Sequence, residues 1–367
     1  MKENIITKVE AFNVRVPLGR PLKLGAIEIP DRQYVIVRVY DEQGYVGTAH
    51  GLTRNAPIAE TVLQTIAGIW TNRSFDQYDS LYELTLKANV CLGTNGIFYR
   101  ALSLFDCALH DLMAIRLGVP LFKYLGGALR STPAILVGGY PVPDESEDTL
   151  SGEMKLYESY KPAGVKIAST TDPLKDGKRL AICRKYLPQD IPLMIDCVWG
   201  QRNAEAFARE VSEWEGLNIG WVEDPFPPDD YESIRLLSEN TRVNVAVGDE
   251  QSGYLNMLRL MDLGKIAVLR LDATVCGGIR SFINIAEEAG KRKIPVSCHV
   301  FHQIHAHLAC VLPGVKWVEY MLPESDIESY QRLWHEDLVL DNGHFTPANR
   351  PGIGTLWNEE AIDYYRE

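Results

Sequence analysis

Five polar side chains stand at the ends of five short apolar stretches in the second half of the chain: Asp196, Glu223, Asp249, Asp272 and His299. Successive members are 27, 26, 23 and 27 residues apart. Each interval has the length of one strand and one helix, and helix-like sequence follows each polar residue. In a parallel barrel the carboxyl ends of all strands open at one face, where the chemistry takes place. We therefore expect these five side chains to converge on one site.

Three of these residues, Asp196, Glu223 and Asp249, end consecutive predicted strands. Carboxylates packed together repel one another, and a hard divalent cation keeps them ionised. Mg²⁺ fits best, because it takes a few carboxylates and keeps positions for water and substrate oxygens. A single acid at a strand end could merely cap the following helix. Three in consecutive units favour a site for one Mg²⁺ per subunit.

The other two residues, Asp272 and His299, end the next two predicted strands, which are neighbours in a barrel. A carboxylate beside Nδ1 of a histidine fixes the tautomer and increases the basicity of Nε2. A lone histidine would more often be structural, but here a predicted metal site lies on the same rim. The pair is therefore predicted to act as a general base.

The elements that must position these residues form an α/β protein. Alternating apolar residues predict antiparallel strands, followed by segments of helical period, at 4–16, 33–41, 45–49, 57–70, 76–88 and 97–117. Barrel strands are expected at 132–137 and 164–168, then before each of the five polar residues, and last at 315–320. The predicted domains are an N-terminal α+β domain (1–130), a barrel (131–321) and a C-terminal segment (322–367) with a short helix near 358–365.

The bulk composition limits the class of partner. The 367 residues suffice for a barrel and a second domain, and 46% hydrophobic with 23% charged residues is ordinary for a globular protein. The net charge of −12 argues against binding nucleic acid or an anionic membrane. It allows an anionic small substrate, since a bound cation reverses the local field. With no signal-like opening and no apolar run of about 18 residues, a cytoplasmic protein is expected. The seven cysteines lack a C-x-x-C pair and are expected to be reduced and buried.

Together with Glu319 at the end of the last predicted strand, this order of acids and histidine resembles the enolase superfamily, in particular its mandelate racemase subgroup. The segments 120–127 and 351–354 resemble that subgroup's domain junction and C-terminus. The resemblance implies a modified (β/α)₇β barrel, a form of TIM barrel, under an N-terminal capping domain that the C-terminal segment completes. It implies Mg²⁺ bound by Asp196, Glu223 and Asp249, and an enediolate formed after Asp272–His299 removes a proton. Glu319 would be the acid that hydrogen-bonds the developing oxyanion.

Two positions depart from the family pattern. Members usually carry Lys-x-Lys at the end of the second barrel strand, the second lysine being a base on the opposite face. Here an ungapped alignment puts Lys166 first and Ala168 second, which predicts loss of the second base and leaves Lys166 to support the substrate carboxylate. A one-residue slip would restore Lys166 as a base, but it would also turn over its neighbours. Val198 replaces an asparagine found in many relatives.

Other histidines give weaker signals. His50 precedes a segment that resembles the family's active-site loop, so it is either a substrate contact or an ordinary surface histidine. His302 and His305 are predicted to lie one turn apart on a helix, without acids or cysteines at ligand spacing. A transition-metal site there is not expected.

One base favours elimination over racemisation, so the predicted reaction is dehydration of a sugar acid, an aldonate or aldarate. Cycloisomerisation of a sugar-acid lactone and racemisation or epimerisation of a 2-hydroxy acid are the alternatives. A non-catalytic family member is the alternative of another class. Residues 17–30 and 50–56, which resemble mobile capping loops, are expected to set specificity. Relatives of this kind are often dimers to octamers, so a homo-oligomer is expected.

Overall fold

The computed structural model describes residues 4–24, 27–142 and 145–367. Two expectations fall partly outside the described residues. Residues 1–3 belong to the opening that showed no secretion signal, and residues 25–26 belong to the predicted specificity segment 17–30.

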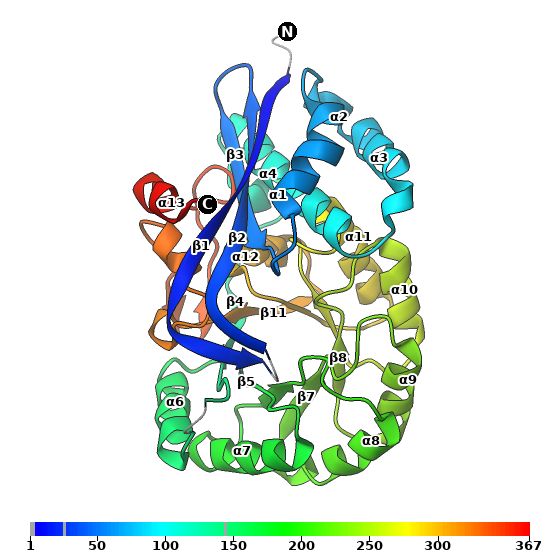
Figure 1. Ribbon diagram of the computed structural model, residues 1–367, viewed down its shortest axis with the longest axis vertical. Coiled ribbons are helices and arrows are strands. Elements are labelled where there is room, and N and C mark those ends of the chain that lie inside the picture. The colour runs from blue at the N-terminus through cyan, green and yellow to red at the C-terminus, as the bar shows by residue number, and fades with distance from the viewer. Residues whose placement is uncertain (1–3, 25–26, 143–144) are drawn as a thin grey trace.

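The N-terminal part is built on an antiparallel sheet of β1 (Ile6–Leu24), β2 (Ile27–Asp41) and β3 (Val46–Leu52). The predicted ends at residues 16 and 33 were wrong, because β1 and β2 continue as a long hairpin towards the barrel (Figure 1). Pro17 predicts a strand end, yet β1 is an edge strand of the described three-stranded sheet, and an edge strand tolerates proline. The C-terminal segment also holds the hairpin, since Arg332 Nη1 donates to Pro17 O at 2.7 Å.

Helices cover one side of this sheet: α1 (Ile58–Thr61), η1 (Val62–Ala67), α2 (Gly68–Trp70), η2 (Phe75–Gln77), α3 (Tyr78–Ala88), η3 (Val90–Leu92), α4 (Ile97–Arg116) and α5 (Leu121–Tyr124). All three predicted helices are present, although a π-helical turn interrupts the first. Helix α4 is buried along most of its length. Gly47 allows β3 to cross it, because a Cβ there would lie 2.1 Å from Ala108 O.

The rest of the fold is a closed barrel of eight parallel strands in which β11 pairs with β4. The strands are β4 (Thr132–Gly138), β5 (Gly164–Ala168), β6 (Leu193–Asp196), β7 (Ile219–Glu223), β8 (Val245–Val247), β9 (Val268–Leu271), β10 (Val296–Cys298) and β11 (Val315–Tyr320). The helices after the first seven strands are α6 (Glu147–Ser159), α7 (Pro173–Tyr186), α8 (Ala204–Ser212), α9 (Tyr231–Asn240), α10 (Tyr254–Asp262), α11 (Gly278–Lys291) and α12 (His302–Val311), with the turn η4 (Glu215–Leu217) before β7. This is the predicted modified TIM barrel.

The barrel interior changes from apolar to charged within two residues. Its lower layer contains Ile135, Met194, Trp221, Ala246 and Val268. Side chains alternate along a strand, so the next inward residue on each strand is two positions further on. On β6, β7 and β9 those residues are Asp196, Glu223 and Arg270. The strand period thus places charged groups inside the barrel, at its carboxyl end.

After β11 the chain leaves the barrel through η5 (Pro323–Ser325), η6 (Tyr330–Leu333), β12 (Leu340–Asp341), β13 (His344–Phe345) and α13 (Glu359–Tyr365). β13 pairs with β4, and Arg366 forms a bridge with Val14 of β1. Figure 1 shows α13 in red beside the blue N-terminal strands. The C-terminal segment therefore contacts both the barrel and the N-terminal sheet. No helix in the described ranges is long and apolar enough to cross a membrane.

Candidate active site

A charged layer of two cations and two carboxylates fills the upper barrel, and all four side chains are buried. Lys166 Nζ lies 2.6 Å from Glu319 Oε1 and also contacts Glu223 Oε1. Arg270 Nε lies 3.1 Å from Glu223 Oε2, and Nη2 donates to Glu319 Oε1. Burial would lower the pKa of Lys166, but Glu223 and Glu319 raise it above its ordinary value. The charges of this layer balance when all four groups are ionised, although burial raises the pKa of Glu223 above its ordinary value.

Glu319 is a hydrogen-bond acceptor in this arrangement. Its Oε1 accepts from Lys166 and Arg270, and its Oε2 accepts from Val300 N at 3.1 Å. Burial alone would raise the pKa of Glu319, but Arg270 and Lys166 lower it to about 2. The resemblance implies an acid that donates here, whereas in this structure Lys166 carries the hydrogens. Sequence reasoning missed Arg270, whose signal is a lone cation inside the apolar stretch 267–271.

Of the predicted metal ligands, Glu223 belongs to this layer, and Asp196 and Asp249 lie beside it at the carboxyl end of the barrel. Asp196 and Glu223 are register partners on adjacent strands. Asp196 Oδ2 is 3.6 Å from Lys166 Nζ, and its Oδ1 accepts from Val198 N at 3.0 Å. Glu223 and Asp249 each offer an oxygen within 4.8 Å of the other and of Asp224, which the sequence reasoning did not select.

These carboxylates fit a hard divalent cation. Asp249 Oδ1 and Asp224 Oδ2 are buried and have no hydrogen-bond partner among the described residues. Buried carboxylate oxygens normally have partners, and several oxygens around one point are the donor set that Mg²⁺ takes.

The histidine at the mouth has the geometry of a base. His299 Nδ1 donates to Asp272 Oδ2 at 2.9 Å. Asp272 Oδ1 accepts from Thr274 N at 2.7 Å and from Thr274 Oγ1 at 2.8 Å, which fixes the carboxylate. His299 Nε2 is therefore free to accept a proton, and it lies 3.6 Å from Asp249 Oδ2. Burial would lower the pKa of His299, but Asp249 and Asp272 raise it.

Strained backbone borders the site on two sides. Val198 and Trp199, after β6, have φ of 50° and 53°, and Val300 and Phe301, after β10, have φ of 50° and 22°. Side chains other than glycine rarely adopt this region, and β-branched valine is the most disfavoured. Such strain persists where surrounding structure holds it, commonly at functional sites.

The register of β5 agrees with the ungapped alignment. Ala168 pairs with Asp196 at the rim, and Lys166 pairs with Met194 one inward position below. Both residues face the interior, so a methyl group stands on β5 where a second base would stand. The catalytic roles of these residues stay predictions.

A pocket of about 270 Å³ lies between the N-terminal part and the loop after β6. Its lining includes Ile29, Arg54 and Asn55 from the two segments expected to set specificity, and Val198 and Trp199 from the barrel. Arg54 Nη2 donates to Glu250 Oε1 at 2.8 Å, and Arg100 of α4 pairs with the same carboxylate. The capping loop is thereby tied to the residue that follows Asp249.

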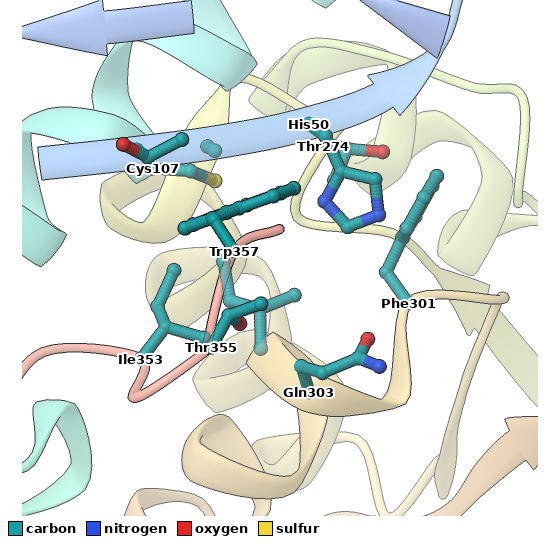
Figure 2. Close-up of a pocket in the computed structure, with 11 residues that line it drawn as sticks. His50, Cys107, Thr274, Phe301, Gln303, Ile353, Thr355 and Trp357 are labelled. Atoms are coloured by element: carbon teal, nitrogen blue, oxygen red, sulfur yellow. The ribbon is translucent and has the colours of Figure 1, made fainter. Parts of the chain in front are cut away.

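His50 is buried, so its interpretation as a surface histidine was wrong. Figure 2 shows it beside Phe301, with Gln303, Thr355 and Trp357 around a small cavity. The cavity measures about 20 Å³, room for about one water molecule. Burial lowers the pKa of His50 to about 3. A contact between His50 and the substrate stays a prediction. In the structure the neutral ring packs against Phe301, and the two ring centroids are 5.0 Å apart.

The other sequence signals are structural. His302 and His305 lie on α12 as predicted. His302 Nε2 pairs with Asp337 at 2.7 Å, while His305 Nδ1 donates to Val300 O and its Nε2 accepts from Ala273 N. All seven cysteines are free, but Cys91 is exposed because it lies in the surface turn η3, so the expectation of burial was wrong there.

The structure is a closed barrel under an α+β domain, with acids and an Asp–His pair at the barrel mouth. This is the architecture of a class of barrel enzymes. A family model described as "Enolase C-terminal domain-like" matches residues 153–361. The N-terminal domain model of the mandelate racemase / muconate lactonizing enzyme family matches residues 6–126. The chain belongs to this family, in the enolase superfamily, as its resemblance predicted.

Individual relatives are distant but cover most of the chain. It is 25% identical over 358 residues to L-talarate/galactarate dehydratase of Salmonella typhimurium, covering 95% of this chain and 85% of the relative. It is 23% identical over 354 residues to arabinonate dehydratase of Saccharolobus solfataricus, covering 93% and 92%. A solved enolase structure from Bradyrhizobium, complexed with magnesium and mandelic acid, has a TM-score of 0.90 at 24% identity and covers 100% of this chain and 99% of its own. That likeness shows the fold.

Proposed function

We propose that this enzyme dehydrates a sugar acid by removing the proton next to the carboxylate. The observation that carries the proposal is His299, whose Nδ1 is held by Asp272 while Nε2 faces the carboxylate cluster at 3.6 Å from Asp249. A base held in one tautomer and directed at the site of an acidic substrate is the geometry that proton abstraction requires.

Asp196, Glu223 and Asp249 would hold a magnesium ion. When bound, the ion would offset the negative charge that develops on the substrate carboxylate. Lys166 would present a fixed ammonium group below the site, and its position between Glu223 and Glu319 keeps it protonated and in place. Such preorganised charge acts without reorganisation during the reaction.

A single base favours elimination over racemisation. His299 would take the α-proton, the bond from the β-carbon to its hydroxyl would break, and the imidazolium would return the proton to that hydroxyl as water. The enol product would tautomerise to a 2-keto acid. Ala168 offers no base for the opposite face, which racemisation through two bases would need. The names of the two dehydratases above support this reaction class.

A screen of aldonates and aldarates with Mg²⁺ tests the proposal. We expect a 2-keto-3-deoxy acid to form from at least one member and not after treatment with a chelator. If a lactone opens or closes without loss of water, the reaction is cycloisomerisation and not dehydration. If an epimer is the only product, the reaction is epimerisation. No turnover of any acid sugar, together with no binding of Mg²⁺, would indicate a non-catalytic protein.

Replacement of Glu319 tests whether the acid near the end of β11 contributes to catalysis. Glu319→Gln keeps the shape of the side chain but removes the charge that pairs with Lys166 and Arg270. We expect kcat to fall by orders of magnitude, because Lys166 and Arg270 lose the buried charge that positions them in the charged layer. The exposed Glu324→Gln, just beyond β11, serves as the control. A kcat within a few-fold of the parent would make Glu319 only a strand-end acid.

A further inference from the structure

Asp224 has an orientation that a regular strand would not give it. It directly follows Glu223, and successive side chains of a strand point to opposite faces, so its carboxylate should point out of the barrel. Its backbone instead has φ of 37°, in the region that residues other than glycine rarely adopt. Both consecutive carboxylates consequently reach the same place, with oxygens within 4.8 Å of each other and of Asp249.

The carboxylate of Asp224 is buried and half satisfied. The residue is 3% exposed, and its Oδ1 accepts from Gly248 N at 3.2 Å. Neither its Oδ2 nor Asp249 Oδ1, on a residue that is 4% exposed, accepts a hydrogen bond from a donor in the described part of the chain, and burial together with the adjacent Asp249 raises the pKa of Asp224. A buried carboxylate oxygen without a partner is strongly disfavoured. Two of them in one cluster point to a cation between them.

The acid that follows Asp249 makes an informative contrast. Glu250 occupies the same position relative to Asp249 that Asp224 occupies relative to Glu223. Its Oε1 accepts from Arg54, and its Oε2 pairs with Arg100. The fold therefore supplies arginines to one of the two additional acids. Asp224 is instead directed into the cluster, and no described residue donates to its Oδ2.

We propose that Asp224 binds the divalent cation through Oδ2, as a ligand additional to the three acids at the strand ends. The inference rests on the proposed function, which places a cation at this mouth. Oxygens that surround one Mg²⁺ lie about 2.1 Å from it, and the spacing of Glu223, Asp224 and Asp249 is compatible with one shared ion.

The test compares Asp224→Asn with the parent, using Mg²⁺ as the only ligand. Isothermal titration should show Mg²⁺ affinity at least about 10-fold lower, since even residues outside the direct ligands typically contribute 10–100-fold. The metal-free variant should unfold at a higher temperature than the metal-free parent, because repulsion within the cluster is relieved. Added Mg²⁺ should then raise its unfolding temperature less. Asp229→Asn, an exposed acid in the same loop, should match the parent in all three measurements.

A purely structural aspartate gives a different pattern. Mg²⁺ affinity equal to the parent's, with a lower unfolding temperature in the absence of metal, would overturn the inference. If Asp224→Asn does not fold, Asp224→Gly provides the same comparison, because glycine adopts positive φ without strain. Parent protein that binds no Mg²⁺ would instead refute the proposed function. The two failures are therefore distinguishable. If the parent does not bind Mg²⁺, the proposed function fails; if the parent binds Mg²⁺ and Asp224→Asn binds it equally well, only the role of Asp224 fails.

Discussion

His299→Asn should stop exchange of the substrate α-proton in D₂O, with no residual activity in the dehydration assay. Asparagine at this position has no basic nitrogen, and Ala168 offers no base from β5. General-base catalysis typically contributes about 10²–10⁴-fold, and a one-sided mechanism leaves no second route for the proton. Exchange measured by NMR on a turned-over acid sugar checks this, and the parent should exchange one epimer only. The exposed His335→Asn is the matched control and should behave as the parent.

Lys166→Met sharpens the same experiment. Its ammonium lies below the rim, between Glu223 and Glu319, so its loss should weaken substrate binding and slow the reaction. Slow exchange through His299 should still be detectable. The exposed Lys316→Met, on β11, controls for loss of a lysine. If exchange survives in His299→Asn but disappears in Lys166→Met, Lys166 is the base. Epimerisation would then be favoured over dehydration by His299.

Asp249→Asn should abolish both activity and Mg²⁺ binding while the fold stays intact. Asp249 faces His299 Nε2 and has a buried oxygen that no described residue hydrogen-bonds, so the substitution removes a ligand without breaking the ion pairs of Lys166 and Arg270. Asp196→Asn and Glu223→Gln should have the same effect on binding. Glu223→Gln should also reduce stability, because Lys166 and Arg270 each lose a buried partner.

Metal binding is measured by titration and by unfolding with and without Mg²⁺. A single bound ion at a concentration 100 times its dissociation constant adds about 2.7 kcal/mol to the free energy of unfolding, and Asp249→Asn should lose this increment. The exposed Asp190→Asn, just before β6 at the opposite end of the barrel, should retain it. Unchanged Mg²⁺ affinity in all three variants at the strand ends would rule out the metal site.

The regular part of the fold could be predicted from periodicity. Apolar strands of four or five residues, each followed by a helix and spaced by 23 to 27 residues, specify a parallel barrel, and its closure brings the strand ends to one face. This is why Asp196, Glu223, Asp249, Asp272 and His299 could be selected together from sequence. The length of the β1–β2 hairpin could not, because Pro17 suggests a loop and the contacts that sustain the strand come from residues beyond 325, such as Arg332.

The protonation and the pairing within the site depended on the tertiary structure. Arg270 reads as one charge in an apolar strand, and only barrel closure places its guanidinium against Glu223 and Glu319. Glu319 is thereby an acceptor rather than a donor. Asp224 should point outward by strand alternation, and a single positive φ directs it inward. A sequence pattern predicts the regular geometry of a single helix or strand. The orientation and the partners of these side chains depend instead on irregular backbone conformations and on side chains from other strands. The strand period determined where the acids gather, and the tertiary structure decided which of them have cations as partners.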